Sequence, residues 1–110
     1  MSSPEGLFPL IMLGRRAGVL VLGQDSVRQA LRCGGSMTIL LSSDVSENVR
    51  RMLRGYEERG QCAVFLLDED RELLESRTGL PRSQIVGLPR DHGLAQRMES
   101  LLSKGGEGNE

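Results

Sequence analysis

The sequence predicts an α/β fold, a three-layer α/β/α sandwich around a central mixed sheet of about four strands. Amphipathic segments with helical spacing alternate along the chain with short, uninterrupted apolar runs. Such runs are typical of strands that are buried on both faces, so we expect helices on both sides of the sheet. With 110 residues, the chain can form one core. We expect a single domain over residues 5–103 and a disordered tail at residues 104–110.

The first helix is expected over residues 5–17, where Leu7 and Ile11 fall on one helical face. Pro9 suits the start of a helix, because the N–H that proline lacks would have no helical acceptor in the first turn. Gly18 ends the helix. Residues 19–22 are all apolar and predict a short buried strand.

The second helix is expected to open at Gln24 or Asp25, directly after Gly23, and to end at Cys33. Its apolar residues have the i, i+3, i+4 spacing of a helix that buries one face. Gly34 and Gly35 then stop the helix. The run Met37–Leu41 follows and predicts the clearest strand of the chain.

The third helix follows the stretch DVSE, which is a capping-box pattern of Asp44 with Glu47; Ser46 is a competing cap. Residues at helical spacing form its apolar face: Val45, Val49, Met52, Leu53 and Tyr56. Residues 63–67 predict the next strand.

The acidic run DEDRE opens a fourth helix, since the helix dipole favours negative charge at that end. Gly79 and Pro81 end this helix, and residues 85–88 predict the last strand. Asp91 is expected to cap the final helix. The residues expected to face inward from it are Leu94, Ala95, Met98, Leu101 and Leu102.

Composition argues against a protein that binds polyanions through charge alone. The net charge is −1, and only 3% of residues are aromatic, so few side chains can stack on bases. Residues 1–59 carry eight arginines and six acids, which makes this half the better candidate for phosphate contacts. All but one of the 14 basic residues are arginines. Arginine suits phosphate recognition, but a codon bias explains the excess equally well.

The cysteines and the hydropathy pattern indicate an intracellular protein. Cys33 and Cys62 form no C-x-x-C pattern, so we expect two reduced thiols. No apolar stretch reaches membrane-spanning length, and the N-terminus lacks a basic region followed by a long apolar segment. The expected location is cytoplasmic, without membrane contact.

No pattern of residues predicts catalysis. His92 is the only histidine, and beside a helix start it is more typical of a surface or capping residue. The segment GQDSVRQALRCGG lacks the lysine and glycine spacing of a phosphate-binding P-loop. The acids around Asp70 suit a solvated helix start better than a metal site. We therefore expect no enzyme activity, no cofactor, no metal and no small-molecule substrate.

Two loops are candidates for binding. The N–H groups that open the second helix, after Gly23, have no helical acceptors and suit a phosphate or a base edge. Residues 79–83 are expected at the end of a neighbouring strand, so the two segments would form one surface. The alternative is a pair of ordinary turns, in which Asp25 or Ser26 caps its own helix.

Three stretches resemble the kink-turn RNA-binding ribosomal-protein family, in its small bacterial, YlxQ-like branch. They are LGRRAGVLVLGQDSVRQALRCG, ILLSSDVSENVRRML and TGLPRSQIVGLPRDHGLA. The resemblance covers roughly residues 7–102. It implies a three-layer α/β/α sandwich and binding to sharply bent RNA stem-loops, in association with the ribosome or with translation.

The resemblance implies a binding motif at the start of the second helix, of the form Gly-x-Asn-Glu with a lysine three residues later. Gly23 matches this motif, whereas Asp25 replaces the usual Asn, Ser26 the usual Glu or Gln, and Gln29 the usual Lys. An ionised Asp only accepts hydrogen bonds and repels phosphate, and the missing lysine removes a phosphate partner. Glu75 stands where the family usually has glycine.

The site residues implied by the resemblance lie in the two loops and along the second helix: Gly23, Gln24, Asp25, Ser26, Arg28, Gln29, Arg32, Leu80, Pro81 and Arg82. The expected partner is a structured RNA, kink-turn-like or ribosomal. The acidic second half of the chain favours an alternative, a protein-interaction module that has kept the fold and lost specific kink-turn binding.

Overall fold

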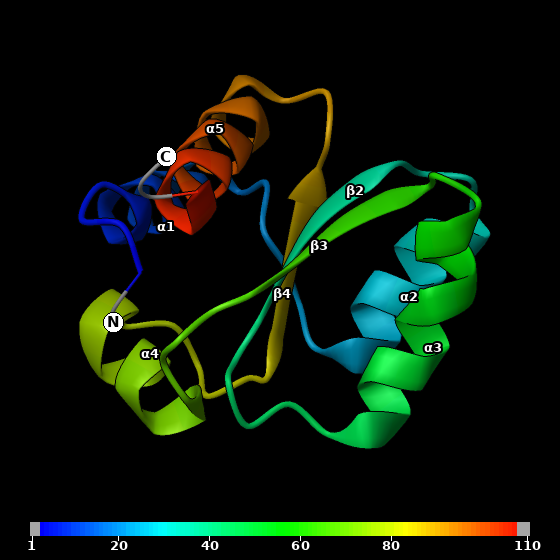
Figure 1. The fold of residues 1–110 in the computed structure, drawn as a ribbon, viewed down its shortest axis with the longest axis horizontal. Helices are drawn as coiled ribbons and strands as arrows, with labels where there is room; N and C mark the ends of the chain where they lie inside the picture. Colours follow the sequence, from blue (N-terminus) through cyan, green and yellow to red (C-terminus); the bar gives the residue numbers. More distant parts are fainter. Residues whose placement is uncertain (1–2, 108–110) are drawn as a thin grey trace.

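The structure is a computed structural model that describes residues 3–107. Helices and strands alternate along this part of the chain, as the sequence predicts (Figure 1). The elements in order are α1 (Leu7–Ala17), β1 (Val21–Leu22), α2 (Gln24–Arg32), β2 (Met37–Leu41), α3 (Glu47–Glu58), β3 (Cys62–Leu66), α4 (Arg71–Thr78), β4 (Ile85–Pro89) and α5 (Gly93–Glu107).

The four strands form one mixed sheet in the order β1-β4-β2-β3. β2 and β3 are parallel, with Met37 beside Cys62 and Leu41 beside Leu66. β4 is antiparallel to both β1 and β2. The predicted mixed sheet of four strands is therefore confirmed, and the first and third strands of the chain form its two edges.

The helices cover both faces of this sheet and complete the predicted three-layer sandwich. α2 and α3 lie on one side, and α1, α4 and α5 lie on the other (Figure 1). Residues of β2 alternate between the two layers, because successive side chains of a strand point to opposite faces. Ile39 packs with the residues of α2 and α3, whereas Leu40 packs with those of α1 and α4.

Gly87 lies at the centre of the sheet, where α2 packs on β4. A Cβ atom at this position would lie 2.8 Å from the Cε atom of Met37 and 3.4 Å from a methyl carbon of Val27. The distance to Val27 is an ordinary van der Waals contact, whereas the closer approach would require the end of the flexible Met37 side chain to move. The glycine therefore lies against Met37 and α2 in the core and not in a turn.

Two strands differ from the sequence prediction. β1 contains only Val21 and Leu22, because Val19 and Leu20 pack as part of the connection from α1 instead of pairing with β4. β3 is not buried on both faces, contrary to expectation: it lies at the sheet edge, and Leu66 is 52% exposed. A continuous apolar run indicates a strand but does not distinguish a central strand from an edge strand.

The ends of three helices resolve or correct the predicted caps. Ser46, and not Asp44, caps α3 by accepting a hydrogen bond from the Val49 N–H at 3.3 Å. The prediction that Asp91 caps α5 is wrong: His92 directly precedes the helix, and its Nδ1 atom accepts from the Leu94 N–H at 3.1 Å. Asp70 caps α4 through the Leu73 N–H.

α5 also extends further than expected. It runs to Glu107 and so includes residues 104–107, which belong to the segment where the sequence predicts a disordered tail. Disorder of that tail stays a prediction. The rest of that predicted tail, residues 108–110, lies outside the described residues. Within residues 3–107, no helix combines the length and the apolar character needed to cross a membrane.

Candidate nucleic-acid interface

The start of α2 presents backbone donors to the surface. Gly23 precedes the helix with φ of 91° and ψ of 156°, a conformation that residues with a side chain rarely adopt. The first helical hydrogen bond runs from the Val27 N–H to the Gly23 carbonyl. Within residues 3–107, the N–H groups of Gln24, Asp25 and Ser26 have no protein acceptor. These donors point out of the positive end of the helix dipole.

Neither polar side chain of this first turn caps the helix. Asp25 and Ser26 are both exposed, and their side chains form no hydrogen bond with any described residue. This is unlike α3 and α4, where Ser46 and Asp70 accept from the first turn. The alternative interpretation of an ordinary self-capped turn therefore does not fit the start of α2.

The sheet brings this helix start beside the segment that leads into β4. Leu22 pairs with Val86, and the Gly23 N–H donates to the Ile85 carbonyl at 3.2 Å. Residues 79–83 directly precede this point of contact. The two predicted loops therefore lie at the same end of the sheet, on neighbouring strands.

Leu80 holds the second loop against the core and does not face outward. Gly79 ends α4 in the left-handed conformation, with φ of 73°, and turns the chain toward β4. Leu80 is only 5% exposed, and it packs with Ile11 and Val86. The expectation that Leu80 is a contact residue does not fit this burial. Pro81 and Arg82, which follow it, are exposed.

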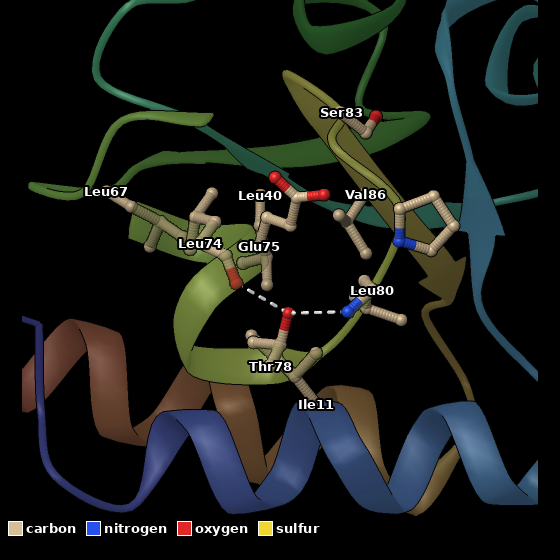
Figure 2. Close-up of a pocket in the computed structure, with 10 residues that line it drawn as sticks. Ile11, Leu40, Leu67, Leu74, Glu75, Thr78, Leu80, Ser83 and Val86 are labelled. Atoms are coloured by element: carbon tan, nitrogen blue, oxygen red, sulfur yellow. Dashed lines mark hydrogen bonds between the residues drawn. The ribbon is translucent and has the colours of Figure 1, made fainter. Parts of the chain in front are cut away.

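The hydroxyl of Thr78 fixes the backbone of this turn. It donates to the Leu74 carbonyl at 2.6 Å and accepts from the Leu80 N–H at 3.2 Å (Figure 2). An apolar cavity of about 10 Å³ lies beneath the loop, between α4 and the sheet. Such a volume holds at most a single water molecule, so the cavity is too small for a ligand.

Glu75 reduces the positive charge that Arg82 offers to a ligand. The Glu75 carboxylate pairs with the Arg82 guanidinium at 2.8 Å, and both side chains remain about half exposed. Hydrogen bonding and charge from Glu75 raise the pKa of Arg82. Glu75, at the position where the family usually has glycine, thus contacts Arg82, the basic residue of this loop.

A third loop, which the sequence does not predict as part of the site, borders the same end of the sheet. It joins β2 to α3. The Ser42 N–H donates to the Gln84 carbonyl at 3.0 Å, and the Ser46 N–H donates to the Gln84 side-chain oxygen at 2.7 Å. The polar stretch SSD directly follows a strand and could have indicated this loop as part of the site, because the ends of neighbouring strands gather at one edge of a sheet.

Asp44 places a negative charge in this third loop. A hydrogen bond from the Ser42 hydroxyl and contacts with Arg71 hold the pKa of Asp44 below its usual value. Arg71 approaches Asp44 at 3.2 Å. The pair joins the third loop to the start of α4, and Asp44 offsets the positive charge of Arg71 near the site.

The remaining basic residues of the region come from α1 and α2. Arg15 donates to the Gly79 carbonyl at 2.7 Å, which places its charge beside the second loop. Arg28 and Arg32 form no ion pair with any described residue, and Arg32 is exposed. Gln29 is exposed between them on α2. Two arginines along α2 therefore offer charge that no acid offsets.

His92 and Glu69 both take part in structural contacts. His92 caps α5 at the opposite end of β4 from the loops. Glu69, in the acidic run before α4, is 2% exposed and accepts hydrogen bonds from the Ser3 N–H and hydroxyl. Over the described part of the chain, no three His, Cys, Asp or Glu side chains gather as a metal site would require.

Comparison with known proteins identifies the family. The chain is 30% identical over 100 residues to the RNA-binding protein YlxQ of Bacillus subtilis strain 168, which covers 86% of this chain and 93% of the relative. The chain belongs to the YlxQ-like branch of the kink-turn RNA-binding ribosomal-protein family. No family model matches the sequence.

Solved structures share the fold of this YlxQ-like chain. A protein of unknown function from Bacillus halodurans has a TM-score of 0.75 at 22% identity, covering 88% of this chain and 96% of its own. The Giardia lamblia 15.5kD RNA binding protein has a TM-score of 0.64 at 14% identity, covering 89% and 82%. At these identities the likeness extends to the three-layer sandwich alone.

Proposed function

We propose that this YlxQ-like protein binds structured RNA of the kink-turn or ribosomal type, in the cytoplasm and in association with translation. The contact surface consists of the start of α2, the arginines along that helix, and Pro81 with Arg82 of the second loop. The observation that carries the proposal is the hydrogen bond between Gly23 and Ile85, which joins the two loops into one surface. The RNA-binding relative YlxQ supports the class of ligand.

The physical contribution of each part is different. The N–H groups that open α2 donate to phosphate oxygens or to acceptors on base edges. Arg28 and Arg32 lie one helical turn apart and supply the charge that attracts the RNA backbone. Arg15, anchored on the Gly79 carbonyl, adds charge where the two loops meet. Pro81 provides an exposed apolar surface for an unstacked base.

Binding is tested by titrating the protein with a kink-turn RNA and with a plain duplex of the same length, at two salt concentrations. The proposal predicts tighter binding to the kink-turn and a salt dependence that corresponds to few phosphate contacts, because few unpaired arginines are available. Equal, weak affinity for both RNAs would rule out kink-turn specificity. No binding to either would rule out this surface as an RNA site.

Replacing Asp25 by Asn tests the position of the RNA. Asp25 is exposed beside the backbone donors of α2, so its charge opposes an approaching phosphate. Asp25→Asn should tighten kink-turn binding by about two- to fivefold, the range of an exposed charge pair. The control is Asp91→Asn, the same chemical change at an exposed position near the opposite end of β4, which should leave affinity unchanged. Unchanged or weaker binding by Asp25→Asn would place the RNA elsewhere.

A second candidate is a protein-interaction module on the same fold. The pairing of Arg82 with Glu75 and of Arg71 with Asp44 favours it, because both pairs offset positive charge at the proposed surface. This candidate predicts no RNA affinity for either oligonucleotide and no response to Asp25→Asn. The same titrations therefore distinguish the two functions.

A further inference from the structure

Along the outer edge of β3, the backbone groups have no hydrogen-bond partner among residues 3–107. The odd-numbered residues of this strand bond to β2, as the Leu67 N–H does to the Leu41 carbonyl and the Gln61 carbonyl to the Met37 N–H. In a parallel pair the N–H and C=O of one residue point the same way. Those of Cys62, Val64 and Leu66 therefore point away from β2. Within residues 3–107, no other strand pairs with β3.

The sequence of this edge lacks features that prevent strand pairing. Residues Cys62–Leu66 contain no charged residue, no proline and no glycine. Leu66 is 52% exposed, the largest exposed fraction among the large apolar side chains that lie on the described surface. An exposed apolar edge strand of this kind is a template for addition of another strand.

We propose that β3 is the contact surface for a second copy of this chain, paired antiparallel about a two-fold axis at Val64. In this register Val64 exchanges hydrogen bonds with its counterpart, and Cys62 exchanges them with Leu66 of the other copy. Every outward N–H and C=O of the strand then has a partner. The contact is self-complementary, as a two-fold interface requires.

Charges on α3 match this arrangement. Val64 and Leu66 line a groove of about 170 Å³ together with Arg50, Arg54 and Glu57 of α3. Because β2 and β3 are parallel and α3 connects them, the helix runs opposite to β3, with Arg50 toward Leu66 and Glu57 toward Cys62.

The two-fold axis places Arg50 of each copy opposite Glu57 of the other, on the same face of the extended sheet. Neither side chain forms an ion pair with a described residue of its own chain. Arg54 lies between them, close to the axis, and is paired with Glu47 of its own helix at 3.8 Å, which reduces repulsion between the two copies. Charge complementarity therefore favours a second copy over an unrelated strand.

Sedimentation equilibrium tests the proposal over about 1 μM to about 1 mM, where weak interfaces associate. The mass of the wild type should rise from 12.1 kDa toward twice that value. Leu66→Lys should remove this rise, because it places a charge in the contact. Leu73→Lys is the matched control, since Leu73 is 41% exposed on α4, and should leave the rise intact. A wild type that stays at the monomer mass throughout overturns the proposal.

Charge exchange tests the register and excludes a loss of folding as the cause. Glu57→Arg and Arg50→Glu should each weaken self-association by about tenfold or more, because each places like charges opposite one another. An equimolar mixture of the two variants should recover the dimer, since every opposing pair is then of opposite sign. Failure of the mixture to recover the dimer overturns the assigned register. β3 lies at the opposite sheet edge from β1, so RNA titrations and these measurements test separate surfaces.

Discussion

At the scale of residues, Glu75 determines how much charge the proposed RNA surface presents. It occupies the position where the family usually has glycine, and it holds the Arg82 guanidinium at 2.8 Å. An exposed ion pair adds little stability, so its main effect here is on the charge available to a ligand. A single acid thus changes a basic loop into a nearly neutral one.

Glu75→Gln should release the charge of Arg82 to the RNA. The variant should bind kink-turn RNA more tightly, and the slope of log affinity against log salt should steepen by about 0.7 to 0.9, the value for one added phosphate contact. Fluorescence anisotropy at four salt concentrations measures both quantities. Glu58→Gln is the control, because Glu58 is an exposed acid at the end of α3, far from the two loops. An unchanged slope would mean that Arg82 does not contact RNA.

At the scale of elements, α2 packs on the centre of the sheet at β4. β4 lies between β1 and β2, and Val27 of α2 lies next to Gly87. A methyl group at Gly87 would be in ordinary contact with Val27 at 3.4 Å, but it would approach the end of the Met37 side chain to 2.8 Å. Because methionine is flexible, Met37 should move aside, and α2 with the backbone donors of the proposed site should keep its position.

Gly87→Ala should change the free energy of unfolding by less than about 1 kcal/mol, because the flexible Met37 side chain can move aside and alanine lowers the entropy of the unfolded chain. Gly93→Ala is the matched control: nothing lies within 4 Å of a Cβ atom at that helical position, and alanine is the better helix former. Urea unfolding of both variants gives the comparison. A loss of more than about 2 kcal/mol in Gly87→Ala alone would mean that the Met37 side chain cannot move aside.

At the scale of the whole molecule, the reactivity of the two cysteines distinguishes the folded protein from the unfolded one. Cys33 is exposed after α2, whereas Cys62 is buried on the α3 side of the sheet. Burial, together with the nearby charge of Glu57, raises the pKa of the Cys62 thiol to about 11. Since the thiolate is the reactive form, Cys62 is inert at neutral pH while the protein is folded.

Thiol labelling at pH 8 should therefore modify one cysteine in the native protein. In Cys33→Ser, the remaining thiol should react only as urea unfolds the chain, with a midpoint that matches the loss of helical circular dichroism. In Cys62→Ser, labelling should be rapid without urea. Rapid labelling of native Cys33→Ser would indicate that β3 detaches from the sheet without global unfolding.

Much of the fold is predictable because the helices and apolar runs are strongly patterned. The face of α3 that contains Val49 and Leu53 and the apolar run of β2 lead directly to a layered α/β arrangement. Strand order does not follow from such patterns, because β3 and β2 have equally apolar sequences although one is an edge and the other is central. Pairing depends on contacts between distant residues, such as Leu22 with Val86.

The two segments of the candidate site and their nearness are predictable, but the burial and pairing of their individual side chains are not. Gly23 and residues 79–83 follow from helix-start and turn chemistry. The burial of Leu80 is not predictable in this way, because a leucine between a glycine and a proline is typical of an exposed turn. Its contacts with the core depend on residues that are distant in the sequence. The roles of Glu75 and Gln84 depend in the same way on the folded arrangement of loops.

The strand order also determines when the protein becomes able to act during its own synthesis. Gly23 is made early, but Ile85, to which it bonds, follows about 3–12 seconds later at usual elongation rates. Until then β1 has no partner in the sheet, and the two halves of the proposed RNA surface remain apart. A nascent chain therefore lacks this surface until the segment through Ile85 has been translated, although the residues of α2 and β2 are made earlier.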